Sequence, residues 1–535
     1  MGNTNDPTHT TPHKEFSFDD PVLVWLRENT YGYNTMIPTP DGPKKRRYFD
    51  FTASGQSFRP IEETIAERVL PFMANTHAES NYSAELMNKL YHQAHEKVRK
   101  ATRCNDEDVV IYTGQGSTSA INKFIGMLGL RIPDNLQEHY NLAAAIPKEQ
   151  RPLVIRSRME HHSNDIPWRE TLADIEFIGF DKQGRIDWKA LDEILSREEY
   201  RNRPLKIGTF SAVSNATGVM NDVNNLAALM HDHGGFACFD YAAGAPYLDI
   251  DMHPDNDPRF RKDAVFISMH KFAGGPQAPG ILVCNKALVR TKSAVDPGGG
   301  TVLFTSPWSH VYLKNVSSRE EGGTPQIVQA IRAGLAWDLK NIVGTERIAA
   351  LEHACITRVA KAWKGHPRIR ILGPDPLETP RLGMISMVLD NTQLHYNLAA
   401  RLLSDKYGIQ VRGGCMCAHT YAYELLSITT PIAKFVQGEM LKGNMALKPG
   451  WVRVSFGPTV SQEDMDVLVD AIPDLADNWR TYAKDYILDP KSADVYHKDD
   501  KREEPHLSFG GPKHHGHSTS SAHASANGGR AVPVT

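Results

Sequence analysis

One lysine is distinguished by its setting in the sequence. Residues 268–280 read SMHKFAGGPQAPG, so Lys271 lies between a histidine and a glycine-rich turn, directly after the apolar run 264–269. A lysine amine held in a mostly apolar pocket has a lowered pKa, and the neutral amine can form a Schiff base with a carbonyl compound. Read alone, Lys271 is better explained by an ion pair at the rim of a sheet.

A second segment, TGQGSTSAIN (113–122), has the composition of a phosphate cradle. Gly114 and Gly116 permit a tight turn, and Ser117 and Thr118 supply hydroxyl groups. The helix expected to follow points its first N–H groups at whatever lies there. The lysine of a GxxxxGK[ST] nucleotide loop is absent, so ATP is not favoured. A plain Gly-Ser turn with a helix cap explains the segment equally well.

An aspartate, Asp240, closes the apolar run 236–239. A carboxylate is costly to bury unless a cation or a donor meets it. Alone, a helix cap or an ion pair is the simpler explanation. A phosphate cradle, this aspartate and Lys271 together are what pyridoxal 5'-phosphate requires, because Asp pairs with the pyridinium nitrogen and Lys carries the aldehyde. The combination therefore predicts a site for this cofactor.

The elements that must position these residues are short apolar runs alternating with helical patterns. The strand-like runs are 108–114, 152–160, 206–215, 234–242, 264–271 and 280–285. Residues 225–233 form a helix pattern that ends at two glycines. Apolar runs buried on both faces and spaced by helices predict an α/β fold with a mainly parallel sheet. Ligands of such sheets bind beyond the carboxyl ends of the strands, where all three motifs fall.

Changes of composition divide the chain into four parts. Residues 1–20 form a loose leader, and 21–325 form a large cofactor-binding domain whose N-terminal segment can pack on the smaller domain. Residues 326–488 hold a linker helix and a smaller α+β domain. The segment 489–535 is charged and then rich in Gly, Ser and His, which predicts a disordered tail.

Composition excludes several classes of protein. The 535 residues carry a net charge of −3, which gives no general reason to bind nucleic acid or an acidic membrane. No apolar stretch approaches 18 residues, and the polar start has no signal-peptide pattern. Six scattered cysteines suit a reducing compartment, so we expect a cytoplasmic protein without a membrane span.

Several segments, in order, resemble the class V aminotransferase family of fold-type I pyridoxal-phosphate enzymes, and especially its cysteine desulfurase and selenocysteine lyase branch. The matching segments are YFDFTASG (48–55), TGQGSTSAIN (113–122), MEHHSNDIPW (159–168), VSNATG (213–218), FDYAAGAPYLDIDM (239–252), SMHKFAGG (268–275), REEGGTP (319–325) and VRVSFGPTVSQED (452–464). The resemblance implies a large domain with a mainly parallel seven-stranded sheet, a smaller α+β C-terminal domain and a homodimer.

The resemblance also assigns roles to residues. Lys271 becomes the cofactor lysine, and Asp240 the partner of the ring nitrogen. His161 is expected to stack on the cofactor ring, and Asn215 to lie near the ring hydroxyl. The phosphate is assigned to Gly116, Ser117, Thr118, Ser268 and His270, with Thr324 reaching the phosphate of the neighbouring subunit.

The segment VRGGCMCAHTYA (411–422) is similar to the desulfurase loop R-x-G-H-H-C-A. By this match Arg412 clamps the substrate carboxylate, and Cys417 is the nucleophile that takes sulfur as a persulfide, for a later sulfur acceptor protein. Cys415 lies two residues earlier, on the same side of an extended loop, so which thiol reacts is left open. Two other readings also remain open, a metal site made by C-x-C-x-H and a pair of packed, unreactive thiols.

Three positions depart from the desulfurase pattern. Ala243 stands where Gln or His contacts the ring oxygen, Tyr241 replaces a small residue, and Cys415–Met416 replaces the His-His pair before the cysteine. We therefore expect an enzyme that acts on an amino acid with pyridoxal phosphate, either a desulfurase or selenocysteine lyase or another class V enzyme such as an aminotransferase, epimerase or lyase. A non-catalytic scaffold is disfavoured by the intact Asp240–Lys271 pair.

Overall fold

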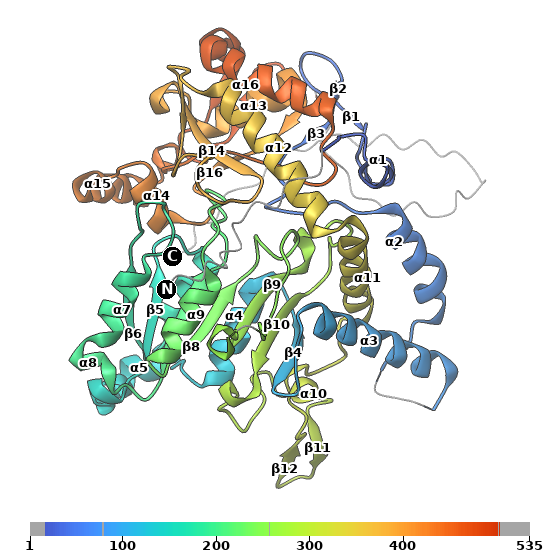
Figure 1. Ribbon diagram of the computed structural model, residues 1–535, viewed down its shortest axis with the longest axis vertical. Coiled ribbons are helices and arrows are strands. Elements are labelled where there is room, and N and C mark those ends of the chain that lie inside the picture. Colours follow the sequence, from blue (N-terminus) through green and yellow to red (C-terminus); the bar gives the residue numbers. More distant parts are fainter. Residues whose placement is uncertain (1–15, 77–79, 256, 501, 503–535) are drawn as a thin grey trace, which may run out of the picture. The chain divides into compact units, whose positions relative to one another are not determined.

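The larger of the two main sheets has seven strands (Figure 1). The computed structural model describes residues 16–76, 80–255, 257–500 and 502. In spatial order the strands are β4 (Asp108–Thr113), β10 (Gly280–Asn285), β9 (Ala264–Ser268), β8 (Phe236–Asp240), β7 (Lys206–Ser211), β5 (Leu153–Ser157) and β6 (Asp174–Ile178). Only β10 runs against its neighbours. The predicted mainly parallel, seven-stranded α/β sheet is confirmed.

Side chains of these strands alternate between two buried faces. Along β9, Val265 and Ile267 join the core shared with the rest of the molecule, whereas Phe266 joins a second core with Phe124 and Trp168. Both faces are covered because successive residues of a strand point to opposite sides. This burial explains why the strands are nearly continuous apolar runs.

Helices cover the sheet on both sides. Helix α4 (Gly116–Leu128) packs on β9 and β10, and α9 (Val223–Asp232) packs on β8. Helix α3 (Tyr82–Ala101) packs against α11 (Ile327–Val343), which lies where the linker helix was expected. Helix α4 follows strand β4, and α9 lies between β7 and β8 in the sequence, so the chain alternates between the sheet and the helices that cover it.

A smaller antiparallel sheet follows in the sequence. Its order is β13 (Ile369–Ile371), β14 (Met384–Leu389), β17 (Trp451–Ser455) and β16 (Arg412–Gly414). Figure 1 shows α12 (Thr345–Trp363), α13 (Tyr396–Tyr407) and α16 (Gln462–Tyr482) gathered beside it. The N-terminal segment joins this region, because β3 (Arg47–Tyr48) pairs in parallel with β15 (Ile409–Gln410). Strands and helices together confirm the expected α+β part.

The remaining elements are short. The helices are α1 (Pro21–Glu28), α2 (Arg59–Thr64), α5 (Asp134–Tyr140), α6 (Ile166–Arg169), α7 (Trp188–Ser196), α8 (Glu198–Arg201), α10 (Val316–Glu320), α14 (His419–Leu425) and α15 (Thr430–Leu441). The single-turn elements are η1 (Ile65–Val69), η2 (Leu70–Phe72), η3 (Leu142–Ala145), η4 (Lys148–Gln150), η5 (His162–Asn164), η6 (Pro258–Phe260), η7 (Met269–Lys271), η8 (Lys286–Leu288), η9 (Asp390–Thr392), η10 (Met445–Leu447) and η11 (Ala483–Asp485). The small hairpins are β1 (Met36–Ile37) with β2 (Lys44–Lys45), β11 (Val302–Thr305) with β12 (His310–Tyr312), and β18 (Tyr486–Leu488) with β19 (Val495–His497).

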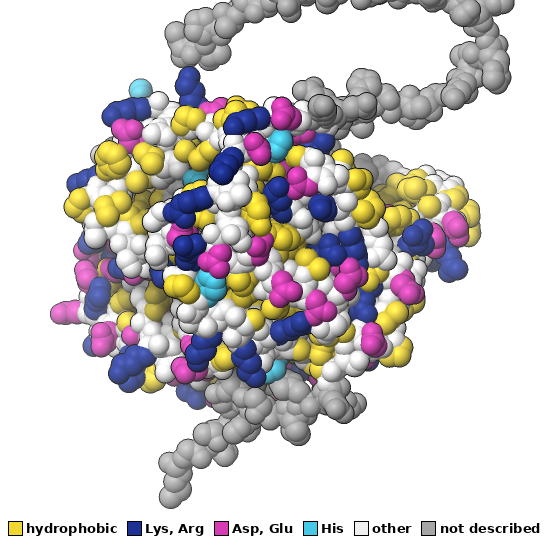
Figure 2. Space-filling model, turned by 90° about the horizontal axis from the view of Figure 1, so that it is seen from above, with side chains coloured by type: hydrophobic (Ala, Val, Ile, Leu, Met, Phe, Trp, Pro, Cys, Tyr) yellow, Lys and Arg dark blue, Asp and Glu magenta, His cyan; other side chains and the backbone are white. Residues whose placement is uncertain are grey.

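The surface carries both signs of charge close together. Figure 2 shows basic and acidic side chains intermingled on the face seen from above, in agreement with the small net charge. Within the described residues, no helix combines the length and the apolar character needed to span a bilayer. Most of the predicted leader and tail lies outside the described residues, although the start of the predicted tail contains β19.

Candidate active site

A cavity of about 190 Å³ opens at the carboxyl ends of the parallel strands. Its lining combines ends of the large sheet with residues of the smaller one. Its lining includes Ser117, Thr118, His161, Asn215, Asp240, Ala243, Ser268, His270, Lys271, Arg412, Met416 and Arg453. Most of the residues expected from sequence to form the site therefore lie around one cavity.

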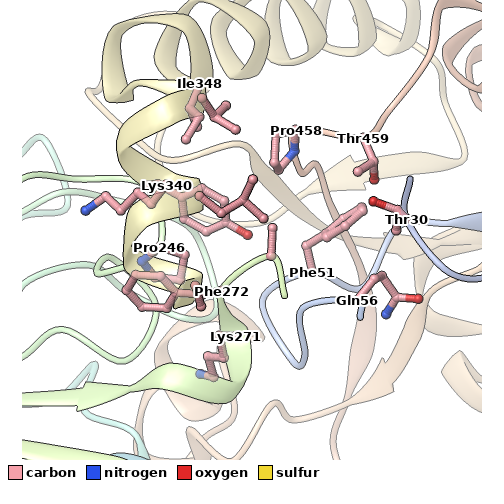
Figure 3. Close-up of a pocket in the computed structure, with 15 residues that line it drawn as sticks. Thr30, Phe51, Gln56, Pro246, Lys271, Phe272, Lys340, Ile348, Pro458 and Thr459 are labelled. Carbon is pink, nitrogen blue, oxygen red and sulfur yellow. The ribbon is translucent and has the colours of Figure 1, made fainter. Parts of the chain in front are cut away.

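Lys271 lies in the turn η7 that directly follows β9. Burial lowers the pKa of this lysine to about 8, and Asp240 opposes that shift while Arg453 adds to it. The neutral fraction of this amine near pH 7 is therefore about a tenth, far more than for an ordinary lysine, and the neutral form is the nucleophile. Figure 3 shows a smaller cavity of about 20 Å³ that Lys271 also borders, with its amino group pointing away from Phe51 and Gln56. That space is roughly enough for one water molecule.

Asp240 ends β8 and is buried. Its Oδ1 atom accepts a hydrogen bond of 2.8 Å from the backbone N–H of Ala242. Burial raises the pKa of this carboxyl, and Lys271 works in the opposite direction. A protonated ring nitrogen entering the cavity would supply the cationic donor that a buried carboxylate needs.

The turn from β4 into α4 is the segment that the sequence predicts to be a phosphate cradle. The backbone N–H of Ser117 donates to the Ser268 hydroxyl at 2.9 Å, which joins the start of α4 to the end of β9. Gly116 has φ +58°, and a Cβ there would lie 2.7 Å from Ser268 Oγ and 2.8 Å from His270 Cε1. Thr118 shares a 2.6 Å hydrogen bond with Ser163. Helix α4 starts at this turn, and the N-terminus of a helix favours an anion bound next to it.

His270 and His161 are both neutral at physiological pH. Burial lowers the pKa of His270 to about 4 and that of His161 to about 3, with Lys271 adding to each shift. The backbone N–H of Ser163 donates to His161 Nδ1 at 3.1 Å, so the proton of this ring is on Nε2. A neutral imidazole in this cavity wall suits stacking on an aromatic ring.

In the described part of the chain, the side-chain amide of Asn215 makes a hydrogen bond to the protein through its nitrogen atom only. Its Nδ2 atom donates to the carbonyl of Met416 at 2.6 Å. Its Oδ1 atom is buried without a hydrogen-bond partner among the described residues. A buried acceptor left unsatisfied is unfavourable, so a donor arriving in the cavity, such as a ring hydroxyl, fits this position.

Two arginines from adjacent strands enter the cavity. Arg412 on β16 lies opposite Arg453 on β17 in the register of the smaller sheet. Arg453 is buried, and it donates to the carbonyl of Asn215 at 2.8 Å and to Asp50 Oδ1 at 2.8 Å. Arg453 was not predicted from the sequence. The available signal was an arginine in the otherwise apolar strand WVRVS, which is tolerated in a core only where it has partners.

The loop that carries the two cysteines follows β16. Arg412 Nη2 lies 3.9 Å from Cys417 Sγ. Cys415 is buried, whereas Cys417 is partly exposed. Met416 and Cys417 have φ of 57° and 54°, a left-handed conformation that side chains other than glycine rarely adopt. Of the two thiols, Cys417 is therefore the one beside the arginine and open to solvent.

Other expected features lie elsewhere or remain predictions. Thr324 is exposed, accepts from Asn75 Nδ2 at 3.1 Å, and lines a separate cavity with Tyr91 and Lys123. Its predicted reach to a neighbouring subunit stays a prediction.

Ala243 lines the main cavity and brings no polar group to it. Among the described residues, no group of three or more His, Cys, Asp or Glu side chains is arranged to hold a metal ion.

A parallel sheet with a buried lysine, a buried aspartate and the start of a helix at its carboxyl edge is the arrangement expected of a pyridoxal-phosphate-dependent enzyme. The aminotransferase class-V family matches residues 47–468, and the chain belongs to this family. A probable cysteine desulfurase from Streptomyces coelicolor is 29% identical over 375 residues, which covers 69% of this chain and 83% of that protein. One from Halalkalibacterium halodurans is 28% identical and covers 69% and 84%.

Solved structures show the same fold. The apo cysteine desulfurase of Thermococcus onnurineus is similar with a TM-score of 0.66 and 22% identity, covering 85% of this chain and 98% of that chain. The Escherichia coli cysteine desulfurase CsdA has a TM-score of 0.65 and 20% identity, with coverage of 85% and 98%. These likenesses confirm the fold-type I architecture expected from the sequence.

Proposed function

We propose that this protein binds pyridoxal 5'-phosphate and removes the sulfur of cysteine, or the selenium of selenocysteine, onto Cys417. The observation that carries the proposal is the 3.9 Å approach of Arg412 Nη2 to Cys417 Sγ, beside the cavity that Lys271 lines. Arg412 lines the same cavity as Lys271, and the partly exposed thiol of Cys417 lies beside Arg412. The relatives named probable cysteine desulfurases support this choice.

The residues present fit the cofactor. Asp240 would pair with the ring nitrogen, His161 would stack on the ring, and the free Oδ1 of Asn215 would accept from the ring hydroxyl. The phosphate would be held by the start of α4 and by the set Gly116, Ser117, Thr118, Ser268 and His270. When bound through Lys271, the cofactor supplies an electron sink for the bonds to the substrate Cα.

Different residues of the chain bind the substrate, move its proton and accept its sulfur. Arg412 binds the substrate carboxylate, and Arg453 adds a second positive charge to the same wall. The neutral amine of Lys271 takes and returns the proton at Cα. The thiolate of Cys417 attacks the substrate sulfur, so that an S–S bond forms as the Cβ–S bond breaks. The carbon gains a proton and leaves as alanine, while Cys417 keeps a persulfide for an acceptor protein.

A second reaction is favoured by one specific observation. Ala243 lines the cavity where desulfurases carry a polar side chain, so that wall supplies no group to carry a proton. A class V transamination, epimerisation or lyase step on another amino acid would need no Cys417.

We also propose a cytoplasmic homodimer in which Thr324 completes the partner's site.

One experiment separates these outcomes. The visible spectrum of the purified protein is recorded before and after addition of L-cysteine, and alanine and sulfide are assayed in the same sample. A visible cofactor band with equal amounts of alanine and released or protein-bound sulfur is the expected result. A band without alanine contradicts the desulfurase function and leaves the second candidate.

The cofactor lysine is tested in parallel. Lys271→Ala is expected to lose the visible band entirely. Lys286→Ala is the matched control, because Lys286 follows the neighbouring strand β10 and bonds the carbonyl of Asp106, away from the cavity. Retention of the band by Lys271→Ala would remove the central claim.

A further inference from the structure

Two histidines outside the predicted cofactor contacts meet beside the cysteine loop. His162 begins η5, after β5 of the large sheet, and His419 begins α14, directly after the cysteines. Their rings stack with centroids 4.8 Å apart and planes inclined by 18°. His419 Nδ1 lies 3.0 Å from His162 Nε2. The pair thus joins two segments that are 257 residues apart in sequence.

The hydrogen bonds fix which nitrogens carry protons. The backbone N–H of His419 donates to His162 Nε2 at 3.2 Å. A nitrogen that accepts from a backbone N–H has no proton of its own, so His162 is protonated on Nδ1. The ring of His419 must therefore donate from its Nδ1 to the same atom. Both bonds exist only while His162 is neutral.

The same two segments hold the cysteine loop directly. The backbone N–H of His162 donates to the carbonyl of Cys417 at 2.7 Å. The Thr420 hydroxyl donates to Asp165 Oδ2 at 3.3 Å. Cys417 and Met416 are both held in the left-handed conformation, which persists only where surrounding contacts impose it. The contacts from residues 162–165 are such a restraint.

We propose that His162 and His419 are positioning residues, a latch that holds the loop of Cys417 beside Arg412 and frees this loop when the contact between the two histidines breaks. The chain has Cys415–Met416 where desulfurases have two histidines before the cysteine, and it has His419 two residues after Cys417 instead. The use of a positioned Cys417 rests on the proposed function. The latch itself is a contact between two segments and can be tested without turnover.

Acid is expected to open the latch. Burial lowers the pKa of His162, and burial with His162 and Lys448 nearby lowers that of His419 to about 4. Asp165 raises the pKa of His162, while Lys448 and Arg169 lower it. Released rings return toward the ordinary value of about 6.5, so the open state binds protons more readily. The closed state is favoured above about pH 6.5 and is weakened as the pH falls below it.

The test measures how fast iodoacetamide labels Cys417 in the holoprotein, with labelled peptides quantified by mass spectrometry. Cys104, which contacts Thr102 away from the cavity, is the internal reference for the amounts of protein and reagent at each pH, and burial raises its pKa to about 11. His162→Phe keeps an aromatic ring for stacking but removes the Nε2 acceptor. We expect its Cys417 to be labelled about tenfold faster at pH 7.5, because two neutral hydrogen bonds are lost.

Two further variants test whether faster labelling of Cys417 depends on the contact between His162 and His419. His162→Gln retains a side-chain acceptor and is expected to restore slow labelling to within about threefold of the wild type. Arg158→Met breaks the exposed 2.5 Å ion pair with Glu424, which joins the same segments without touching the histidines. Its effect should stay within about twofold, because exposed ion pairs contribute little. Equal acceleration in His162→Phe and Arg158→Met would overturn the latch.

The wild-type protein gives an independent check if His162→Phe does not fold. Its Cys417-to-Cys104 labelling ratio is expected to rise as the pH falls from about 7.5 to about 5.5, across the ordinary histidine pKa. A ratio that stays flat across this range overturns the proposal. Failure of the desulfurase proposal would be seen as absent alanine production, a different readout that leaves the labelling result intact.

Discussion

Asn215 donates from Nδ2 to the carbonyl oxygen of Met416 across 2.6 Å. This bond connects the loop after β7 of the large sheet to the cysteine loop of the smaller one. It also fixes the amide so that Oδ1, which has no partner among the described residues, is left for a ligand. One side chain therefore holds the loop that carries Cys417 and leaves an acceptor for the expected cofactor.

Asn215→Ala is expected to weaken binding of pyridoxal phosphate about tenfold, since an acceptor for the ring hydroxyl is lost. Spectroscopic titration of the cofactor-free protein measures the dissociation constant. Asn225→Ala is the control, because Asn225 lies in the first turn of α9 and bonds Asp222. An unchanged dissociation constant in Asn215→Ala would contradict the assignment of Oδ1.

Cys417→Ser is expected to abolish protein-bound persulfide and to leave the visible cofactor band unchanged. The reason is that Cys417 lies beside Arg412 and is partly exposed, and it is not one of the residues expected to contact the cofactor. Persulfide is measured by mass spectrometry of the intact protein after L-cysteine is added.

Cys415→Ser supplies the matched comparison for that prediction. Cys415 is buried two residues away, so its variant is expected to keep most of the persulfide. If persulfide is lost in Cys415→Ser and kept in Cys417→Ser, the reactive thiol has been assigned to the wrong residue.

The pKa of Lys271, about 8, predicts how cofactor uptake depends on pH. The amine must be neutral to attack the aldehyde, and it becomes neutral as the pH rises through its pKa. The rate of uptake by the cofactor-free protein should therefore increase up to about pH 8 and then level off. Stopped-flow absorbance measures this rate. An increase that continues to the ordinary lysine value of about 10.4 would show that burial does not tune this amine.

The residue types at the site were more predictable from the sequence than the contacts that bring distant segments together there. Lys271, Asp240 and the turn at Gly116 each follow an apolar strand, and parallel strands bring their carboxyl ends to one edge. Strand β6 was missed because it lies at the edge of the sheet, where its residues 174–177 are only partly buried or exposed and the segment DIEFI is not continuously apolar. The roles of the individual site residues remain predictions.

Contacts between distant segments could not be predicted in the same way. Arg453 enters the cavity only because β17 pairs with β16 in the register that places it opposite Arg412. The meeting of His162 with His419 depends on how the loop after β5 packs against the start of α14. Neither periodicity nor composition encodes such a packing relation, so both emerged only from the structure.

Gly116→Ala tests the cradle through stability as well as binding. The added Cβ would lie 2.7 Å from Ser268 Oγ in a backbone with φ +58°, so both crowding and backbone strain oppose it. We expect the free energy of unfolding to fall by roughly 1–3 kcal/mol and cofactor affinity to fall with it. Gly298→Ala is the control, since a Cβ there meets nothing within 4 Å and its φ is not in the left-handed region. Urea denaturation of both cofactor-free variants measures the difference. Equal stability of the two variants would mean that the turn relaxes without loss, and that glycine at position 116 is not needed for the cradle.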